Sequence, residues 1–322
     1  MNNSQFISQS SSDVIDSAAS QLVAAHLVAF PTETVYGLGA DATNRDAIRR
    51  IYEVKGRPTD HPLIVHISSI NLLKLWASEI PEFAIKLARD FWPGPLTLVL
   101  KRTLEAKDFI TGGQDSVAIR VPNHPIALAL LQSFESKGGK GVAAPSANRF
   151  GQVSPTSSHD VLLELGDYLG IGDLILDGGK CEVGIESTII DCTFENPYIL
   201  RPGAITSAMI EKSTGLKITV AAKSSIRTSG NLEKHYAPQA KVILDGIPKV
   251  GQGFIALSDI ETPSGVIRVA APNTAEEFSQ ILYESLRKID ILGLKEVVVA
   301  QPIGEDTEVG IRDRLSKAAK GR

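Results

Sequence analysis

Four cationic side chains stand at positions where a charge needs a partner. Arg120 interrupts the apolar run SVAIRV, Arg201 follows the apolar residues YIL, and Lys55 and Arg57 close a helical segment in KGRP. A buried guanidinium must be paired, and its planar fork binds two oxygens of a carboxylate or phosphate at once. For Lys55 and Arg57 taken alone, complementing a helix dipole is the simpler interpretation. Together the four cations predict a cleft for an anionic ligand.

Hydroxyl and amide side chains occur beside the same segments. Thr34 follows a short apolar strand in FPTETVYGLG, Ser146 and Asn148 follow another in APSAN, and Ser116 and Ser187 begin two further strands. Each motif alone could be an ordinary turn. Cations and hydroxyls without a charged nucleophile favour positioning and charge stabilisation, as in phosphoryl or nucleotidyl transfer.

Several common catalytic and binding motifs are absent. The sequence has no GxxxxGK[ST], GxSxG, HExxH or CxxC, and its six histidines never have metal-ligand spacing. GQGFIA (251–256) precedes a strand instead of following one, so it lacks the context of a dinucleotide-binding loop. Cys181 and Cys192 stand eleven apart and match no metal site or disulfide framework. These absences argue against an enzyme with a nucleophile and a general base.

The elements that must position these side chains alternate between strand and helix patterns. Strands at 96–100 and 116–121 have no long helical pattern between them, which predicts some antiparallel pairing. We therefore expect an α/β fold over 15–210, with a twisted mixed parallel and antiparallel sheet and flanking helices. Polar residues with glycine and proline predict a linker over 211–239, and a small Rossmann-like α/β domain is expected over 240–322.

Composition and charge narrow the functional classes. The chain has 322 residues, 43% hydrophobic and 22% charged, which is typical of a soluble globular protein. The net charge is −4, with −3 before Pro238 and −1 after it, so neither part is basic enough to bind nucleic acid by bulk charge. No stretch has the order of a signal peptide or the length of a membrane span. We therefore expect a cytoplasmic protein.

Six sequence blocks, in order over about 15–210, resemble the YrdC-type threonylcarbamoyl-AMP synthases. They are FPTETVYGLG, KGRP running into PLIVHI, WPGPLTLVL, SVAIRVPNHP, APSANRFGQVSPT, and GIESTIIDC followed by LRPG. KHYAP (234–238) and the ending VGIRDRLSKAAKG resemble the long, two-domain form of that family. The resemblance implies a nucleotidyltransferase that converts ATP, bicarbonate or carbon dioxide, and L-threonine to threonylcarbamoyl-AMP and pyrophosphate. The product would supply the threonylcarbamoyladenosine modification of tRNA through a separate transferase.

The resemblance also implies roles for individual residues. Lys55 and Arg57 would be catalytic, and a magnesium ion would arrive with ATP, with no metal ligands from the protein. Around threonine it places Thr34, His66, Arg120 and Ser187. Around ATP it places Lys55, Arg57, Ser116, Ser146, Asn148, Ser154, Arg201 and Tyr236. We further expect the linker to fold over the ATP site as a lid, with Tyr236 merely pinning the two domains together as the alternative.

One position departs from the family pattern, because His61 stands where an Asn often precedes PLIVHI. If that Asn contacts the nucleotide, the contact is altered here. Other functions of the same fold stay open: an RNA-binding module without synthase activity, a domain fused to a carbamoyltransferase, or an ATPase with an unrecognised phosphate site. The acidic first part argues against the RNA-binding module, and direct contact with tRNA is expected to be weak at most.

Overall fold

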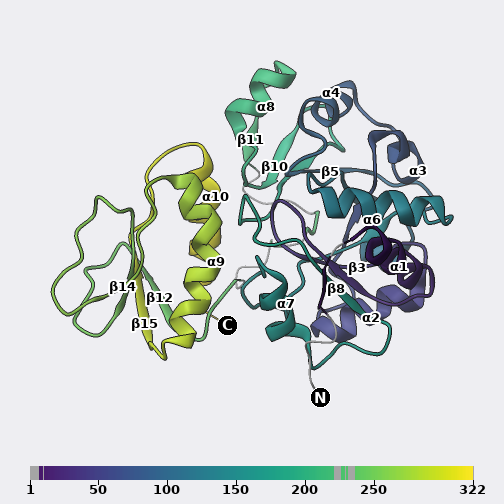
Figure 1. Ribbon diagram of the computed structural model, residues 1–322. Helices are drawn as coiled ribbons and strands as arrows, with labels where there is room; N and C mark the ends of the chain where they lie inside the picture. The colour runs from purple at the N-terminus through teal and green to yellow at the C-terminus, as the bar shows by residue number, and fades with distance from the viewer. Residues whose placement is uncertain (1–6, 10, 221–225, 229, 231–235, 322) are drawn as a thin grey trace.

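Two sheets organise the chain (Figure 1). The computed structural model describes residues 7–9, 11–220, 226–228, 230 and 236–321. Within them, one sheet has eleven strands in the order β1–β8–β2–β3–β7–β4–β6–β5–β9–β10–β11. The other has four, in the order β12–β15–β13–β14. We call the parts of the chain that carry these sheets the first and the second domain. Among the described helices, none has the length and apolarity needed to span a membrane.

The first domain alternates short strands with helices. Its strands are β1 (Ile7–Gln9), β2 (Val28–Phe30), β3 (Gly37–Asp41), β4 (Ile64–His66), β5 (Leu96–Lys101), β6 (Ser116–Arg120), β7 (Val142–Ala143), β8 (Leu174–Asp177), β9 (Thr188–Asp191), β10 (Tyr198–Arg201) and β11 (Thr219–Val220). Its helices are α1 (Ser12–Val23), α2 (Arg45–Lys55), η2 (Ile70–Leu72), α3 (Leu73–Trp76), α4 (Glu82–Phe91), α5 (Asp108–Thr111), α6 (Pro125–Ser136), α7 (Ser158–Leu165) and α8 (Ser207–Thr214).

The predicted mixed sheet is confirmed. β5 runs antiparallel to β6, its neighbour in sequence, and β9 runs antiparallel to β10. β4 lies parallel to β6, and β5 lies parallel to β9. The starts of some strands therefore lie beside the ends of others, which decides where the polar side chains gather.

Capping fixes the helix that carries the KGRP motif. The Asn44 side chain accepts hydrogen bonds from the backbone N–H groups of Asp46 and Ala47, at 3.0 and 3.1 Å. Gly56 ends α2 with φ at 61°, a left-handed conformation that glycine adopts without strain. These two caps place Lys55 in the last turn of the helix.

Strand residues alternate between two cores on opposite faces of the first sheet. Ala29, Leu38 and Val65 join α2 and α4 in one hydrophobic cluster, whereas Phe30 joins α1 and α6 in another. This is the period-two alternation of a sheet buried on both faces. Ile64 precedes Val65 and points to the opposite face of the sheet. It packs there with Val99, Ala118 and Ile189 in a small cluster. The small cluster lies under the site described below.

The first sheet continues beyond the predicted end of its domain. Residue 210 falls inside α8, whose N-cap is Thr206, and β11 then pairs parallel with β10. The first sheet therefore reaches residue 220, inside the segment predicted as a linker, 211–239. Eleven residues of that segment, 221–225, 229 and 231–235, lie outside the described residues, and so does the predicted lid.

The second domain is a parallel sheet with two helices. It comprises β12 (Lys241–Leu244), β13 (Gly253–Ile255), β14 (Ile267–Ala270), α9 (Ala275–Ile291), β15 (Glu296–Val299) and α10 (Thr307–Ala318). All three strand pairings are parallel. Figure 1 shows α9 and α10 between this sheet and the first domain. Val35, Val153 and Ile185 of the first domain share a hydrophobic cluster with both helices, so the two domains are packed together.

Candidate functional site

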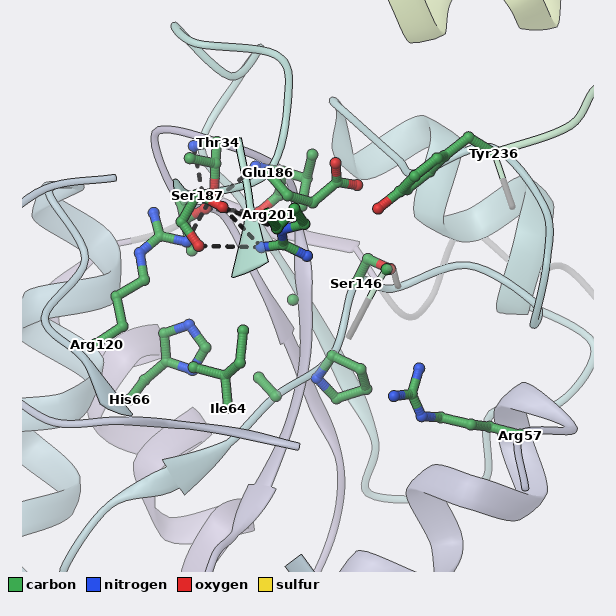
Figure 2. A pocket seen from close by; sticks show the side chains of 16 residues that line it. Thr34, Arg57, Ile64, His66, Arg120, Ser146, Glu186, Ser187, Arg201 and Tyr236 are labelled. Atoms are coloured by element: carbon green, nitrogen blue, oxygen red, sulfur yellow. Dashed lines mark hydrogen bonds between the residues drawn. The ribbon is translucent and has the colours of Figure 1, made fainter. Parts of the chain in front are cut away.

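A pocket of about 520 Å³, partly open to solvent, lies over one half of the first sheet. Figure 2 shows Arg120 and His66 on one side of it and Arg57 and Tyr236 on the other. It is lined by Thr32, Thr34, Val35, Gly37, Arg57, Ile64, His66, Arg120, Ala144, Pro145, Ser146, Glu186, Ser187, Arg201, Gly230 and Tyr236. Eight of these sixteen residues were predicted as site residues from the sequence.

The mixed strand directions bring these residues together. His66 and Arg120 end the parallel strands β4 and β6 and are register partners. Ser187 precedes β9, which lies parallel to β5, and β5 runs antiparallel to β6. The start of β9 therefore lies at the same edge of the sheet as the end of β6. Arg201 ends β10, which is antiparallel to β9, and so joins that edge as well.

Arg120 is fixed at one side of the pocket by three partners. Its Nη2 lies 2.6 Å from Oε1 of Glu33, and both side chains are buried. Its Nη1 donates to the Thr34 hydroxyl at 2.9 Å, and its Nε donates to the carbonyl of Gly94 at 3.3 Å. The opposite charge of Glu33 and these two hydrogen bonds offset part of the desolvation of the buried guanidinium. Arg120 is therefore held in one orientation, with Thr34 beside it.

His66 is a neutral imidazole. Burial, together with the smaller effect of the nearby Arg120 cation, lowers the pKa of His66 to about 3. The ring meets Phe30 edge to face, with centroids 5.8 Å apart. At neutral pH the ring offers one N–H donor and one acceptor, so it suits a polar uncharged or mixed group better than a phosphate.

Arg201 and Ser187 form a second buried pair. Arg201 donates to the Ser187 carbonyl from Nε at 3.0 Å and from Nη2 at 2.9 Å, and Nη2 also lies 3.1 Å from the Ser187 hydroxyl. The same hydroxyl is 2.7 Å from that of Thr97. The hydroxyl and the guanidinium therefore face the pocket as one polar unit (Figure 2).

Arg57 enters the pocket from the opposite side. Its Nη2 donates to the carbonyl of Pro62 at 3.1 Å, and its guanidinium lies 5.8 Å from the centre of the Phe150 ring. Burial lowers the pKa of Arg57 to about 10, so it stays a cation at neutral pH. His61 meets the same Phe150 ring edge to face, with centroids 5.4 Å apart. The residue that departs from the family pattern is thus a neighbour of Arg57.

Lys55 lies behind the pocket and does not line it. Its side chain is fully buried, and its Nζ donates to the carbonyls of Ser146, at 2.6 Å, and Asn148. Burial lowers the pKa of Lys55 well below its usual range. Lys55 therefore holds the APSAN segment, while Ser146 of that segment faces the pocket.

Three other predicted ATP residues lie outside this lining. Asn148 donates to the carbonyls of Arg149 and Gln152, at 2.7 and 2.9 Å, and so shapes the segment that follows Ser146. Ser154 is fully buried and donates to Glu186 at 2.6 Å. Ser116 lines an adjacent hollow of about 270 Å³, which shares Ile64 with the pocket.

Two acidic residues of the site were not among the predicted residues. Glu33 pairs with Arg120, and Glu186 lines the pocket beside Ser187. Both stand inside motifs recognised in the sequence, FPTETVYGLG and GIESTIIDC. In a pocket predicted to bind anions, a carboxylate could not be given a role from the sequence, because the cation that pairs with it was not known. In the structure Glu33 forms an ion pair with Arg120, and Glu186 forms one with Arg314 of the second domain.

The donor set of the site does not include a cluster for a resident metal. Among the described residues, no three His, Cys, Asp or Glu side chains gather where they could hold an ion. The two carboxylates of the site are each engaged by an arginine. The arrangement can bind and orient anions and stabilise charge on them.

Known proteins share both domains of the chain. Residues 20–203 match the family of Sua5, YciO and YrdC proteins, described as telomere recombination. Residues 205–320 match the C-terminal domain of threonylcarbamoyl-AMP synthase. The threonylcarbamoyl-AMP synthase of Pyrococcus abyssi is 41% identical, over 91% of this chain and 90% of its own. That of Bacillus subtilis is 40% identical, over 96% of this chain and 93% of its own.

A solved structure extends the similarity to three dimensions. The crystal structure of Pyrococcus abyssi Sua5 complexed with L-threonine superimposes with a TM-score of 0.88 and 37% identity. The match covers 98% of this chain and 97% of that one, so both domains are shared. The chain belongs to the threonylcarbamoyl-AMP synthase family, in its two-domain Sua5 form.

Proposed function

We propose that the pocket binds L-threonine and ATP side by side and makes threonylcarbamoyl-AMP. The observation that carries this proposal is the convergence of three buried guanidiniums, Arg57, Arg120 and Arg201, on one space in a chain of this family. Two anionic substrates need two separate sets of cations, and the pocket has cations on opposite sides (Figure 2).

The threonine subsite is proposed at the side of Arg120. Its fixed guanidinium binds the carboxylate, and the hydroxyls of Thr34 and Ser187 and the neutral His66 ring bind the amine and hydroxyl groups. A neutral histidine suits this place, because an imidazolium would repel the threonine ammonium group. The Sua5 structure complexed with L-threonine supports this choice of ligand.

The ATP subsite is proposed at the side of Arg57, Arg201 and Tyr236, with Ser146 beside them and Ser116 in the adjacent hollow. We propose that Lys55, Asn148 and Ser154 do not contact ATP directly, but hold the backbone and side chains that form this side of the pocket. Magnesium is proposed to enter with ATP, held by phosphate oxygens and water.

The reaction follows from bringing these ligands together. The threonine amine and carbon dioxide, supplied by bicarbonate, form a carbamate and release a proton. A carbamate oxygen attacks the α-phosphorus of ATP, a new P–O bond forms, and the bond to the β-phosphate oxygen breaks to release pyrophosphate. The arginines stabilise the charge that spreads over the phosphoryl oxygens, and no acyl-enzyme is needed. A tRNA-modifying transferase is the proposed consumer of the product.

Pyrophosphate release tests the proposal. We expect release only when ATP, L-threonine and bicarbonate are all present. Release of pyrophosphate from ATP alone at the same rate would indicate a hydrolase that cleaves ATP to AMP. Release of phosphate in its place would indicate an ATPase, and release of neither under any combination would leave a binding module. Replacing L-threonine with D-threonine provides the matched control, since it has the same charges in the wrong arrangement.

A further inference from the structure

A buried carboxylate from the first domain depends on the second domain for its counter-charge. Glu186 lines the pocket and is 6% exposed. Its Oε2 accepts from Nε of Arg314 at 2.7 Å and from the Tyr283 hydroxyl at 2.8 Å. Its Oε1 accepts from the Ser154 hydroxyl at 2.6 Å. Arg314 lies on α10 and Tyr283 on α9, so both helices of the second domain complete this group.

Arg314 also binds the backbone that carries two pocket residues. Its Nη2 donates to the carbonyl of Glu186 at 3.2 Å, directly before Ser187. Its Nη1 donates to the carbonyl of Pro202 at 3.0 Å, directly after Arg201. The arginine is 1% exposed and therefore forms part of the wall behind the pocket.

The same arginine packs against Tyr236. The Arg314 guanidinium lies 5.5 Å from the centre of the Tyr236 ring, and the ring stacks on Tyr283 with centroids 5.6 Å apart. Tyr236 is 1% exposed, and its backbone adopts φ of 62°. Two second-domain side chains thus hold Tyr236 of the KHYAP motif in place where it lines the pocket.

The charge of Glu186 creates a problem that Arg314 solves. Burial raises the pKa of Glu186, but Arg314, Arg201 and the hydrogen bonds outweigh burial and hold it at about 2. Glu186 is therefore anionic at neutral pH, in a pocket proposed for phosphates. Arg201 is the other cation that lowers the pKa of Glu186, and the proposed reaction needs its charge for ATP.

We propose that Arg314 of the second domain is a positioning residue for ATP binding. It compensates the charge of Glu186, so that the positive charge of Arg201 serves the phosphates and not this carboxylate, and it holds Tyr236 against the pocket. The second domain is then a part of the ATP site, not an independent ligand-binding module. This inference rests on the proposed function, because it takes ATP as the ligand at the side of Arg57 and Arg201.

Substitutions in the full-length chain test this role. Arg314→Met removes the counter-charge, Arg314→Lys keeps the charge without the planar fork, and Glu186→Gln removes the charge that needs compensation. Arg312→Met is the matched control, because Arg312 lies on the same helix but donates to Pro302 and Gly304 within the second domain. Binding of a non-hydrolysable ATP analogue with Mg²⁺ is measured by calorimetry, and KM is measured for ATP and for threonine.

We expect Arg314→Met to weaken analogue binding at least tenfold, with less than a threefold change in the KM for threonine. Arg314→Lys should lose less affinity for the analogue than Arg314→Met. Combining Arg314→Met with Glu186→Gln should restore most of the lost affinity, because the double variant no longer has a buried carboxylate for Arg201 to balance. Arg312→Met should bind within threefold of wild type.

The proposal is overturned if Arg314→Met binds the analogue like wild type, or loses both substrates equally. It is also overturned if the double variant is no better than Arg314→Met. If Arg314→Met shows no thermal unfolding transition and is therefore not folded, analogue binding by Arg314→Lys and by the double variant tests the proposal. Analogue binding needs no turnover, so a wild-type protein that binds ATP but makes no product would refute the proposed function and leave this test intact.

Discussion

The guanidinium of Arg120 and the carboxylate of Glu33 form a buried ion pair, with Nη2 2.6 Å from Oε1. Oε2 of Glu33 also accepts from the backbone N–H of Asn123 at 3.0 Å. The carboxylate thus ties Arg120 to the loop that follows its own strand. It orients the guanidinium toward Thr34, where we place the carboxylate of threonine.

Arg120→Ala should raise the KM for threonine far more than that for ATP. A hydrogen bond to a charged group contributes about 1.5–3 kcal/mol, which corresponds to roughly 10–100-fold in affinity. The KM for ATP should change by less than threefold. Arg120→Lys, which keeps the charge but not the fork, is the control and should fall between wild type and Arg120→Ala. Equal changes in the two KM values would show that the carboxylate does not bind there.

Lys55 and Arg57 should differ although they stand two residues apart. Lys55→Met removes the donor from two buried carbonyls, and we expect it to lower the free energy of unfolding by about 2–4 kcal/mol. Arg57→Met faces the pocket and should change that free energy by less than about 1 kcal/mol while weakening ATP binding more than tenfold. Denaturant unfolding and calorimetry measure the two effects. A fully stable Lys55→Met protein would contradict the structural role of Lys55.

Burial of neutral His66 makes stability fall in mild acid. Its folded-state pKa of about 3 lies below the unfolded value of 6.5, so the unfolded chain takes up a proton first as the pH falls. Between pH 6.5 and 5 this contributes a loss of about 2 kcal/mol. His66→Asn should remove that part of the pH dependence of the unfolding free energy. His159→Asn, at an exposed histidine, should not, and identical pH curves for His66→Asn and wild type would contradict the burial of a neutral ring.

His61→Asn tests the position that departs from the family pattern. Burial and the Arg57 cation lower the pKa of His61, so the ring is neutral at pH 7 and packs on Phe150 beside Arg57. Asn would lose the ring contact but provide an amide for the nucleotide. We expect ATP affinity to change by less than about fivefold, or roughly 1 kcal/mol, and threonine affinity to stay constant. A loss of more than fiftyfold would make His61 itself an essential nucleotide contact.

Local patterns predicted much of the fold, and long-range pairing explains what they missed. The two ends of α2 are set by local contacts of its caps, Asn44 and Gly56. Arg120 and Arg201 were recognisable because a cation in an apolar strand needs a partner. Lys55 was expected in the cleft, and no local pattern could show that it lies behind the pocket, because its partners, the carbonyls of Ser146 and Asn148, lie more than 90 positions away. The pairing of β11 with β10 was not predicted, because β11 is only two residues long.

The roles of Glu33 and Glu186 could not be predicted from the motifs that contain them. Arg314 lies 128 positions from Glu186 and in another domain, so no local pattern joins the two. The role of a buried carboxylate in an anion-binding pocket can be assigned only when the cation that pairs with it is known.

Mass spectrometry of the reaction product tests the central claim most directly. The full-length protein is incubated with ATP, Mg²⁺, L-threonine and ¹³C-labelled bicarbonate, and the nucleotide products are analysed at once, because the mixed anhydride is labile. We predict threonylcarbamoyl-AMP, heavier by the single ¹³C atom, together with pyrophosphate. Only ADP and phosphate, or an AMP product without the label, would contradict the account.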